Sequence, residues 1–425
     1  MLWQVCDKEP SPVTAHFYKI KHIISKLIQT KEENIFKGWM YFMNTKELAQ
    51  ERTQIFTDVL EGKIPKRVPV YAMLTYEFAI QYAGMDMMEA QWHTEQYFEK
   101  VADIICQDFY SDSFGVTNLR FPAMYRTLGA RNWLMGSSGF MQHPEVVGLE
   151  ADEYDDFIAS PYDCIIEKVL PRLYTNLNTD PHQKAITMAK AFKIFFEEMG
   201  RVAEIAAKMT EKYGYGQANF FAGACEAPLD FVADQLRGFR NISADIRRMP
   251  DKVKAAAEAV TPVMIKMGIP APLPNSAVFI PLHMAPFMRT KDAEELYFPT
   301  FKKVVDELAA LGHRCFLFVE ENFMRYLDLL YEFPEGTIMM FEYGDPKLTK
   351  EKIGDKHIIA GFYPVTMLKT ATKQECIDKA KELIDTLAPG GRYIFTLDKS
   401  PVSVGDINPD NLKAVYEYVG KHANY

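Results

Sequence analysis

Four polar side chains stand at or near the carboxyl ends of strand-like apolar stretches in the second half of the chain. They are His283, Glu320, Glu342 and Asp398, in stretches at residues 277–283, 314–320, 337–343 and 392–398. A helical pattern follows each stretch, and strand–helix alternation predicts a parallel sheet. In a closed parallel barrel the carboxyl ends of the strands converge on one face, which holds the chemistry. We therefore expect these dispersed residues to form one site.

The whole chain supplies enough strands for such a barrel. A further stretch lies at residues 357–363, and three earlier ones lie at residues 67–74, 115–122 and 218–225. The total of eight predicts an α/β fold, a (β/α)8 TIM barrel with an N-terminal helical extension. We expect the extension to cover residues 1–60, with an amphipathic helix around residues 17–30, and the barrel domain to cover residues 61–425.

Composition excludes several classes of protein. The chain has 425 residues, of which 48% are hydrophobic, and a net charge of -9. An acidic protein lacks the basic footprint of nucleic-acid binding and is not attracted to anionic membranes. We find no apolar run of about 18 residues, so no transmembrane helix is expected. The first residues lack the pattern of a signal peptide, which predicts a cytoplasmic protein.

Five local motifs occur in an order that identifies a superfamily. They span residues 45–73, 147–161, 237–260, 293–322 and 358–395. Together they resemble the uroporphyrinogen decarboxylase superfamily over roughly residues 50–425. The resemblance implies the same barrel fold. It also implies one of two chemistries: decarboxylation of uroporphyrinogen, or methyl transfer involving a cobalt corrinoid on a partner protein.

The motif residues favour the methyltransferase branch. Decarboxylases of the superfamily carry arginines just after the first strand, whereas residues 73–78 here read Met-Leu-Thr-Tyr-Glu-Phe. A tetrapyrrole with many carboxylates needs several cations. Thiol-directed methyltransferases carry H-x-C and a late cysteine, where this chain has Phe318, Glu320 and Asp398. The chain thus resembles the O-demethylase methyltransferases, which move a methyl group from an aryl methyl ether to cobalt(I) of a corrinoid protein.

The resemblance implies a zinc ion that acts as a Lewis acid on the departing oxygen. Catalytic zinc has three protein ligands and one open position, and we predict His283, Glu320 and Glu342 as these ligands. Asp398 is predicted to be a fourth ligand or to support one. Glu321 is predicted to donate a proton to the leaving phenolate. The corrinoid is expected to arrive on another protein.

Aromatic and methionine side chains cluster after the first strand. The chain is 13% aromatic and contains 22 methionines. Tyr71, Met73, Tyr76 and Phe78 are predicted to form a wall that binds a flat aromatic ring. Ordinary core packing explains the same cluster.

Each candidate also has a structural interpretation. His283 is explained as a core histidine, Asp398 as a helix cap, and Glu342 as a partner of Lys347. Glu320 and Glu321 fit the start of an exposed loop. A different metal trio would combine Glu321 and Glu342 with His357, but that histidine begins its strand. The rival functions are a uroporphyrinogen decarboxylase and a non-catalytic module that binds a corrinoid protein. A homodimer stays open.

Overall fold

Eight strands lie in two parallel sheets, one with the order β5 to β10 and one that pairs β1 with β2. The computed structural model describes residues 45–117 and 120–425. Each of the eight predicted stretches overlaps a strand, and the predicted (β/α)8 barrel is confirmed. The strands are β1 (Leu74–Thr75), β2 (Val116–Thr117), β5 (Asn219–Ala224), β6 (Ser276–Leu282), β7 (Arg314–Val319), β8 (Ile338–Phe341), β9 (Ile358–Gly361) and β10 (Tyr393–Ile394).

Backbone contacts beside the short strands close the ring. β5 to β10 form one parallel sheet, and β1 pairs with β2. Val70 forms a parallel bridge with Phe395, which joins the β1 side to β10. The Gly216 N–H donates to the Asp112 carbonyl (2.7 Å), which joins the β2 side to β5. All carboxyl ends therefore face one way.

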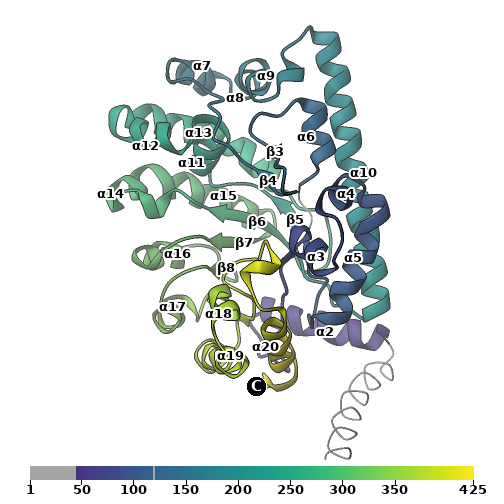
Figure 1. Ribbon diagram of the computed structural model, residues 1–425. Helices are drawn as coiled ribbons and strands as arrows, with labels where there is room; N and C mark the ends of the chain where they lie inside the picture. The colour runs from purple at the N-terminus through teal and green to yellow at the C-terminus, as the bar shows by residue number, and fades with distance from the viewer. Residues whose placement is uncertain (1–44, 118–119) are drawn as a thin grey trace, which may run out of the picture.

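Helices cover the outside of the barrel (Figure 1). No helix within the described ranges has the apolar length to cross a membrane. Their bounds are α2 (Thr45–Leu60), α3 (Tyr76–Tyr82), α4 (Met87–Trp92), α5 (Thr94–Asp108), α6 (Pro122–Leu128), α7 (Tyr154–Ala159), α8 (Pro161–Cys164), α9 (Leu170–Leu173), α10 (Pro181–Tyr213), α11 (Pro228–Phe231), α12 (Phe239–Arg248), α13 (Pro250–Gly268), α14 (Thr290–Asp292), α15 (Phe298–Ala310), α16 (Leu327–Tyr331), α17 (Pro346–Ile353), α18 (Val365–Thr370), α19 (Lys373–Leu387) and α20 (Pro409–His422).

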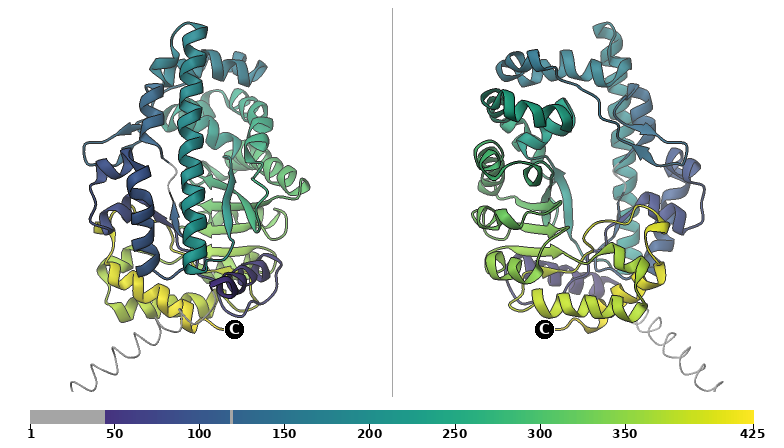
Figure 2. Two further views of the ribbon diagram at one scale, coloured as in Figure 1. Left: turned by 90° about the vertical axis from the view of Figure 1, so that its right-hand side faces the viewer. Right: turned by 60° about the vertical axis from the view of Figure 1, so that its left-hand side comes forward.

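Local sequence explains where the long helices begin and end. Asp180 caps α10 by accepting the N–H groups of the next turn, and a proline occupies the first helical position. α10 ends at Gly214, whose φ of 64° suits glycine. A Cβ at Gly214 would lie 2.8 Å from the Thr45 carbonyl oxygen, so only glycine fits against the start of α2. α10 packs along α5 and α6 (Figure 2).

α2 packs against the barrel rather than standing apart. Phe56 makes edge-on ring contacts with Tyr71 (6.3 Å between centroids) and Phe220 (5.9 Å) in the barrel interior. Residues 45–60 thus belong with the barrel in their packing. The predicted helix at residues 17–30 lies outside the described residues, and the extension before residue 45 stays a prediction.

A long insertion between β2 and β5 faces the carboxyl ends of the middle strands. It carries a small antiparallel hairpin of β3 (Leu134–Met135) and β4 (Met141–Gln142). We call residues 130–148 the hairpin segment. The turn of the hairpin contains the Gly-Ser-Ser-Gly sequence at residues 136–139. The hairpin segment forms a wall opposite the carboxyl ends of β5, β6 and β7.

Candidate functional site

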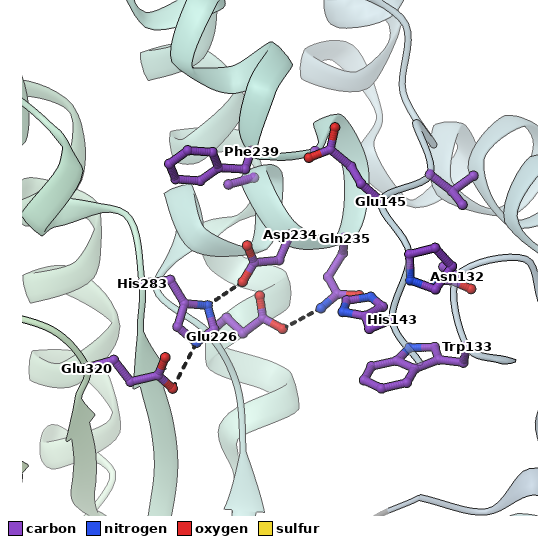
Figure 3. Close-up of a pocket in the computed structure, with 14 residues that line it drawn as sticks. Asn132, Trp133, His143, Glu145, Glu226, Asp234, Gln235, Phe239, His283 and Glu320 are labelled. Atoms are coloured by element: carbon purple, nitrogen blue, oxygen red, sulfur yellow. Dashed lines mark hydrogen bonds and ion pairs between the residues drawn. The ribbon is translucent and has the colours of Figure 1, made fainter. Parts of the chain in front are cut away.

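A cavity of about 420 Å³ lies beyond the carboxyl ends of β5, β6 and β7 (Figure 3). Three parts of the chain line it: the ends of β6 and β7, the segment after β5, and the hairpin segment. Its lining includes the side chains of Trp133, His143, Glu145, Glu226, Asp234, Gln235, Phe239, His283 and Glu320. Carboxylates, imidazoles and aromatic rings therefore meet in one space, as expected for a ligand site.

His283 stands directly after β6 and is held between two carboxylates. Its Nδ1 contacts Asp234, and its Nε2 lies 3.3 Å from Glu320 Oε1, at the end of β7. Burial alone would lower the pKa of His283. Hydrogen bonds to Asp234 and Glu320, with the charge of Asp230, raise this pKa to about 11. The imidazole is therefore a cation at neutral pH.

Asp230 fixes the backbone beneath His283. It is fully buried and accepts the N–H groups of His283 (3.0 Å) and Met284 (2.8 Å). The Tyr297 hydroxyl also donates to Asp230 (2.6 Å). Burial raises the pKa of this carboxyl to about 6 despite these bonds. Asp230 positions the loop after β6 and so sets the direction of the imidazole.

Glu226 lies two residues beyond β5 and points into the same region (Figure 3). Gln235 Nε2 donates to Glu226 Oε1 (2.9 Å), while Oε2 is buried with no hydrogen-bond partner among the described residues. Burial, together with the charges of Asp234 and Asp230, raises the pKa of Glu226 to about 8. A buried oxygen without a partner is costly, so this one is available to a ligand.

Asp234 and Gln235 belong to a π-helical turn, η4 (Val232–Arg237), that follows α11. Such turns are rare and frequent at functional sites. Here the turn directs Asp234 to His283 and the neighbouring Gln235 to Glu226. One irregular turn thus holds the two groups that stand at the ends of β5 and β6.

The hairpin segment supplies a stack of rings on the opposite wall. The rings of Trp133 and His143 are stacked with centroids 4.0 Å apart and an interplanar angle of 6°. Tyr125 stacks on Trp133 at 5.6 Å. Burial lowers the pKa of His143, so this ring is neutral. Flat, uncharged rings at a cavity wall suit a flat apolar ligand.

The predicted residues of the later strands do not join this cavity. Glu342 Oε1 lies 2.6 Å from the Lys399 ammonium, and Glu342 Oε2 accepts the N–H of Glu321 (2.9 Å). Glu321 is exposed, and its φ is 60°. Lys399 therefore neutralises the charge of Glu342, which was predicted to bind zinc. Glu321, the predicted proton donor, faces solvent. Glu342 therefore pairs with Lys399 and not with Lys347, the partner given by its structural interpretation.

Asp398 caps a helix, as the structural interpretation of this residue predicts. Its Oδ1 accepts the N–H groups of Val365 (3.0 Å) and Lys399 (2.7 Å), the first of which begins α18. The side chain is 8% exposed, and burial raises its pKa to about 6. Backbone N–H groups thus occupy one oxygen of the side chain that was predicted to be a fourth zinc ligand or to support one.

The predicted zinc ligands are therefore only partly assembled. His283 and Glu320 meet, but Glu342 is engaged with Lys399. In the described parts of the chain, no group of three or more His, Cys, Asp or Glu side chains is arranged to hold a metal ion. The alternative trio with His357 fails too, because that residue is buried and its Nε2 contacts the Tyr331 carbonyl. The arrangement does not fit a three-ligand zinc centre, and no chemical step is assigned to one.

The predicted aromatic wall is part of the core. Tyr71, Met73, Tyr76 and Phe78 are each at most 8% exposed, and none of the four lines the cavity. The Tyr76 hydroxyl donates to the Ala90 carbonyl (3.0 Å), which leaves its ring inside the protein. Tyr71 and Met73 pack in one buried apolar cluster, whereas Tyr76 and Phe78 lie in α3 and pack in another. Core packing explains this cluster.

Three of the missed residues could have been found from sequence. Glu226 immediately follows the predicted strand at residues 218–225, so the rule applied to the other strand ends would have included it. Asp230 and Asp234 lie four residues apart, the spacing of one helical face. By contrast, nothing in the pattern singles out Trp133 or His143, which lie in a segment expected to be loop-rich.

A barrel of eight strands with its polar site at the carboxyl ends defines a (β/α)8 protein with an enzyme-like cavity. The family model for uroporphyrinogen decarboxylase (URO-D) matches residues 165–422, and the chain belongs to this family. Among solved structures, a methyltransferase from Methanosarcina mazei is similar, with a TM-score of 0.57 and 15% identity over 88% of this chain and 98% of that one. At this identity the likeness concerns the fold. A search of curated proteins finds no match.

Proposed function

We propose that the chain is a methyltransferase that removes the methyl group of an aryl methyl ether and passes it to cobalt(I) of a corrinoid on a partner protein. One observation carries the proposal: within the described residues, the cavity has rings and four acidic side chains in its wall but neither lysine nor arginine. A polycarboxylate such as uroporphyrinogen would be repelled there, because carboxylates need cationic partners. A neutral methoxylated ring meets no such penalty.

The groups around His283 suit the departure of an oxygen anion. As the methyl carbon leaves, negative charge develops on the ether oxygen. A fixed imidazolium in a partly buried cavity stabilises that charge more than water does. Asp234 and Glu320 hold the ring, and Asp230 holds its backbone. The protein therefore needs little reorganisation when the charge appears.

The stacked rings of the hairpin segment suit the rest of the substrate. Trp133 and His143 provide a flat wall across the cavity from His283. A volume of about 420 Å³ accommodates a single substituted aromatic ring. The cobalt would approach from the solvent side, since the strand interior beneath the cavity is filled by apolar side chains.

Zinc remains a prediction of the family resemblance, as does the corrinoid partner. His283 and Glu320 are the predicted ligands that lie together, but Glu342 is not with them. Metal analysis of the purified protein tests this prediction separately from the reaction. Zinc at one equivalent supports it, and metal-free protein that retains full activity contradicts it.

The test of the reaction uses the purified chain, a corrinoid protein reduced to cobalt(I), and methoxyphenols. We expect free phenol in step with the spectral change from cobalt(I) to methyl-cobalt(III). Release of carbon dioxide from uroporphyrinogen would replace the proposal with the decarboxylase. Turnover of methylated thiols or amines without any aryl ether would reject the substrate class. Binding of the corrinoid protein with no turnover would favour a non-catalytic binding module.

A further inference from the structure

We propose that Glu226 is the acid that protonates the oxygen from which the methyl group leaves. The inference rests on the proposed function and assigns a proton donor to that site. The sequence predicted Glu321 for this role, but its side chain is exposed and outside the cavity lining. Glu226 lies in the lining, beside His283 (Figure 3).

The geometry leaves one oxygen of Glu226 ready for a substrate. Gln235 Nε2 donates to Oε1 at 2.9 Å and so fixes the carboxyl group. Oε2 is buried and lacks a protein partner in the described residues. A carboxyl group held at one oxygen and open at the other can present its proton in a constant direction.

The charges around Glu226 favour its protonated form. Asp230 and Asp234, on the segment after β5, oppose a further negative charge, while His283 on the β6 side acts in the opposite sense. Burial is the largest cause of the raised pKa of Glu226, which is about 8, and the two carboxylates add to it. At neutral pH the cavity thus holds both a cationic imidazole and a neutral acid. General acids work best when their pKa lies near the operating pH.

The step balances with these groups. The bond between oxygen and the methyl carbon breaks, and its electron pair stays on oxygen. The electron pair of cobalt(I) in the partner's corrinoid forms the new cobalt–carbon bond. Glu226 gives its proton to the oxygen, so the product leaves as a neutral phenol. Solvent then returns a proton to the carboxylate.

The experiment measures methyl-cobalt formation in single turnover by wild-type protein and the E226Q variant with a series of ring-substituted anisoles. Glutamine keeps the size of the side chain and an acceptor for Gln235. For substrates whose phenols are weak acids, we expect a rate loss of roughly 10²- to 10⁴-fold. For nitroanisole, whose phenolate leaves without a proton, we expect a much smaller loss. E226D retains an acid and should recover part of the rate.

E321Q is the matched comparison, because Glu321 was the predicted donor. A greater loss in E321Q than in E226Q, or an equal loss by E226Q across all substrates, would overturn the assignment of Glu226 alone. No turnover of any aryl ether by the wild type would overturn the proposed function and this assignment together. The dependence on the leaving group separates proton donation from a purely structural role, which would slow every substrate alike.

Discussion

The two halves of the carboxyl face use similar side chains for different purposes. At β5 to β7, Glu226, His283 and Glu320 open into a cavity. At β8 to β10, Glu342 is bound by Lys399 and Asp398 accepts two backbone N–H groups. A polar residue at the end of a barrel strand is thus free to act on a ligand only where neighbouring backbone N–H groups and lysine side chains do not bind it. The first half is expected to carry the chemistry and the second to hold the loops.

The largest expected effect separates the halves at His283. H283A removes the cation that faces the departing oxygen and leaves Asp234 and Glu320 facing each other. We expect the rate of methyl transfer to fall by roughly 10²- to 10³-fold, the usual cost of one such group. Single-turnover spectroscopy measures it, with circular dichroism to confirm folding. A folded H283A protein with wild-type rates would show that the catalytic site does not lie at the end of β6.

A smaller effect is expected on the wall opposite the strand ends. W133A removes the ring that stacks between Tyr125 and His143. Loss of about 1 kcal/mol of ring contact should raise KM roughly five- to ten-fold, with little change in kcat. W133F, which keeps a flat ring, is the control. Equal KM values for W133A and the wild type would show that the substrate does not reach this wall.

Asp398 offers a test in the second half through stability. Its pKa is about 6 in the folded protein against an ordinary 3.8, so the folded state binds the proton more tightly. Its contribution to stability is therefore present at low pH and is lost as the pH rises through about 6. D398N keeps the oxygen acceptor without the charge. We expect it to increase the free energy of unfolding by about 1–3 kcal/mol near pH 8, with activity preserved.

Urea unfolding at several pH values measures this change. D398A is the control, because it also lacks the titrating carboxyl group but loses the cap of α18, so it should be about 1 kcal/mol less stable than D398N at every pH. A D398N protein as inactive as H283A would return Asp398 to the catalytic residues predicted from sequence.

The smallest effect is expected at Glu342. Its partner Lys399 is partly exposed, so the ion pair contributes less than about 1 kcal/mol. E342Q should therefore leave activity nearly unchanged. If the wild type contains zinc, E342Q should contain the same amount, measured by elemental analysis beside H283A. Loss of zinc in E342Q with a normal fold would restore Glu342 as a ligand.

The strand positions could be predicted because apolar stretches and helices alternate with a regular spacing, and the barrel follows from that order. Which strand ends are functional could not, because it depends on contacts between distant residues such as Glu342 and Lys399. Tyr71 and Phe78 were misassigned because apolar side chains that line a site and those that fill a core have the same sequence pattern. Glu226 was missed because it lies just beyond the predicted strand end.

A crystal structure of the chain with a bound methoxyphenol tests the central claim most directly. The account predicts the ring in the cavity between the Trp133–His143 stack and the ends of β5 to β7, with its methoxy oxygen against His283 and Glu226. A ring bound over Glu342 and Lys399, with the cavity near His283 empty, would contradict it.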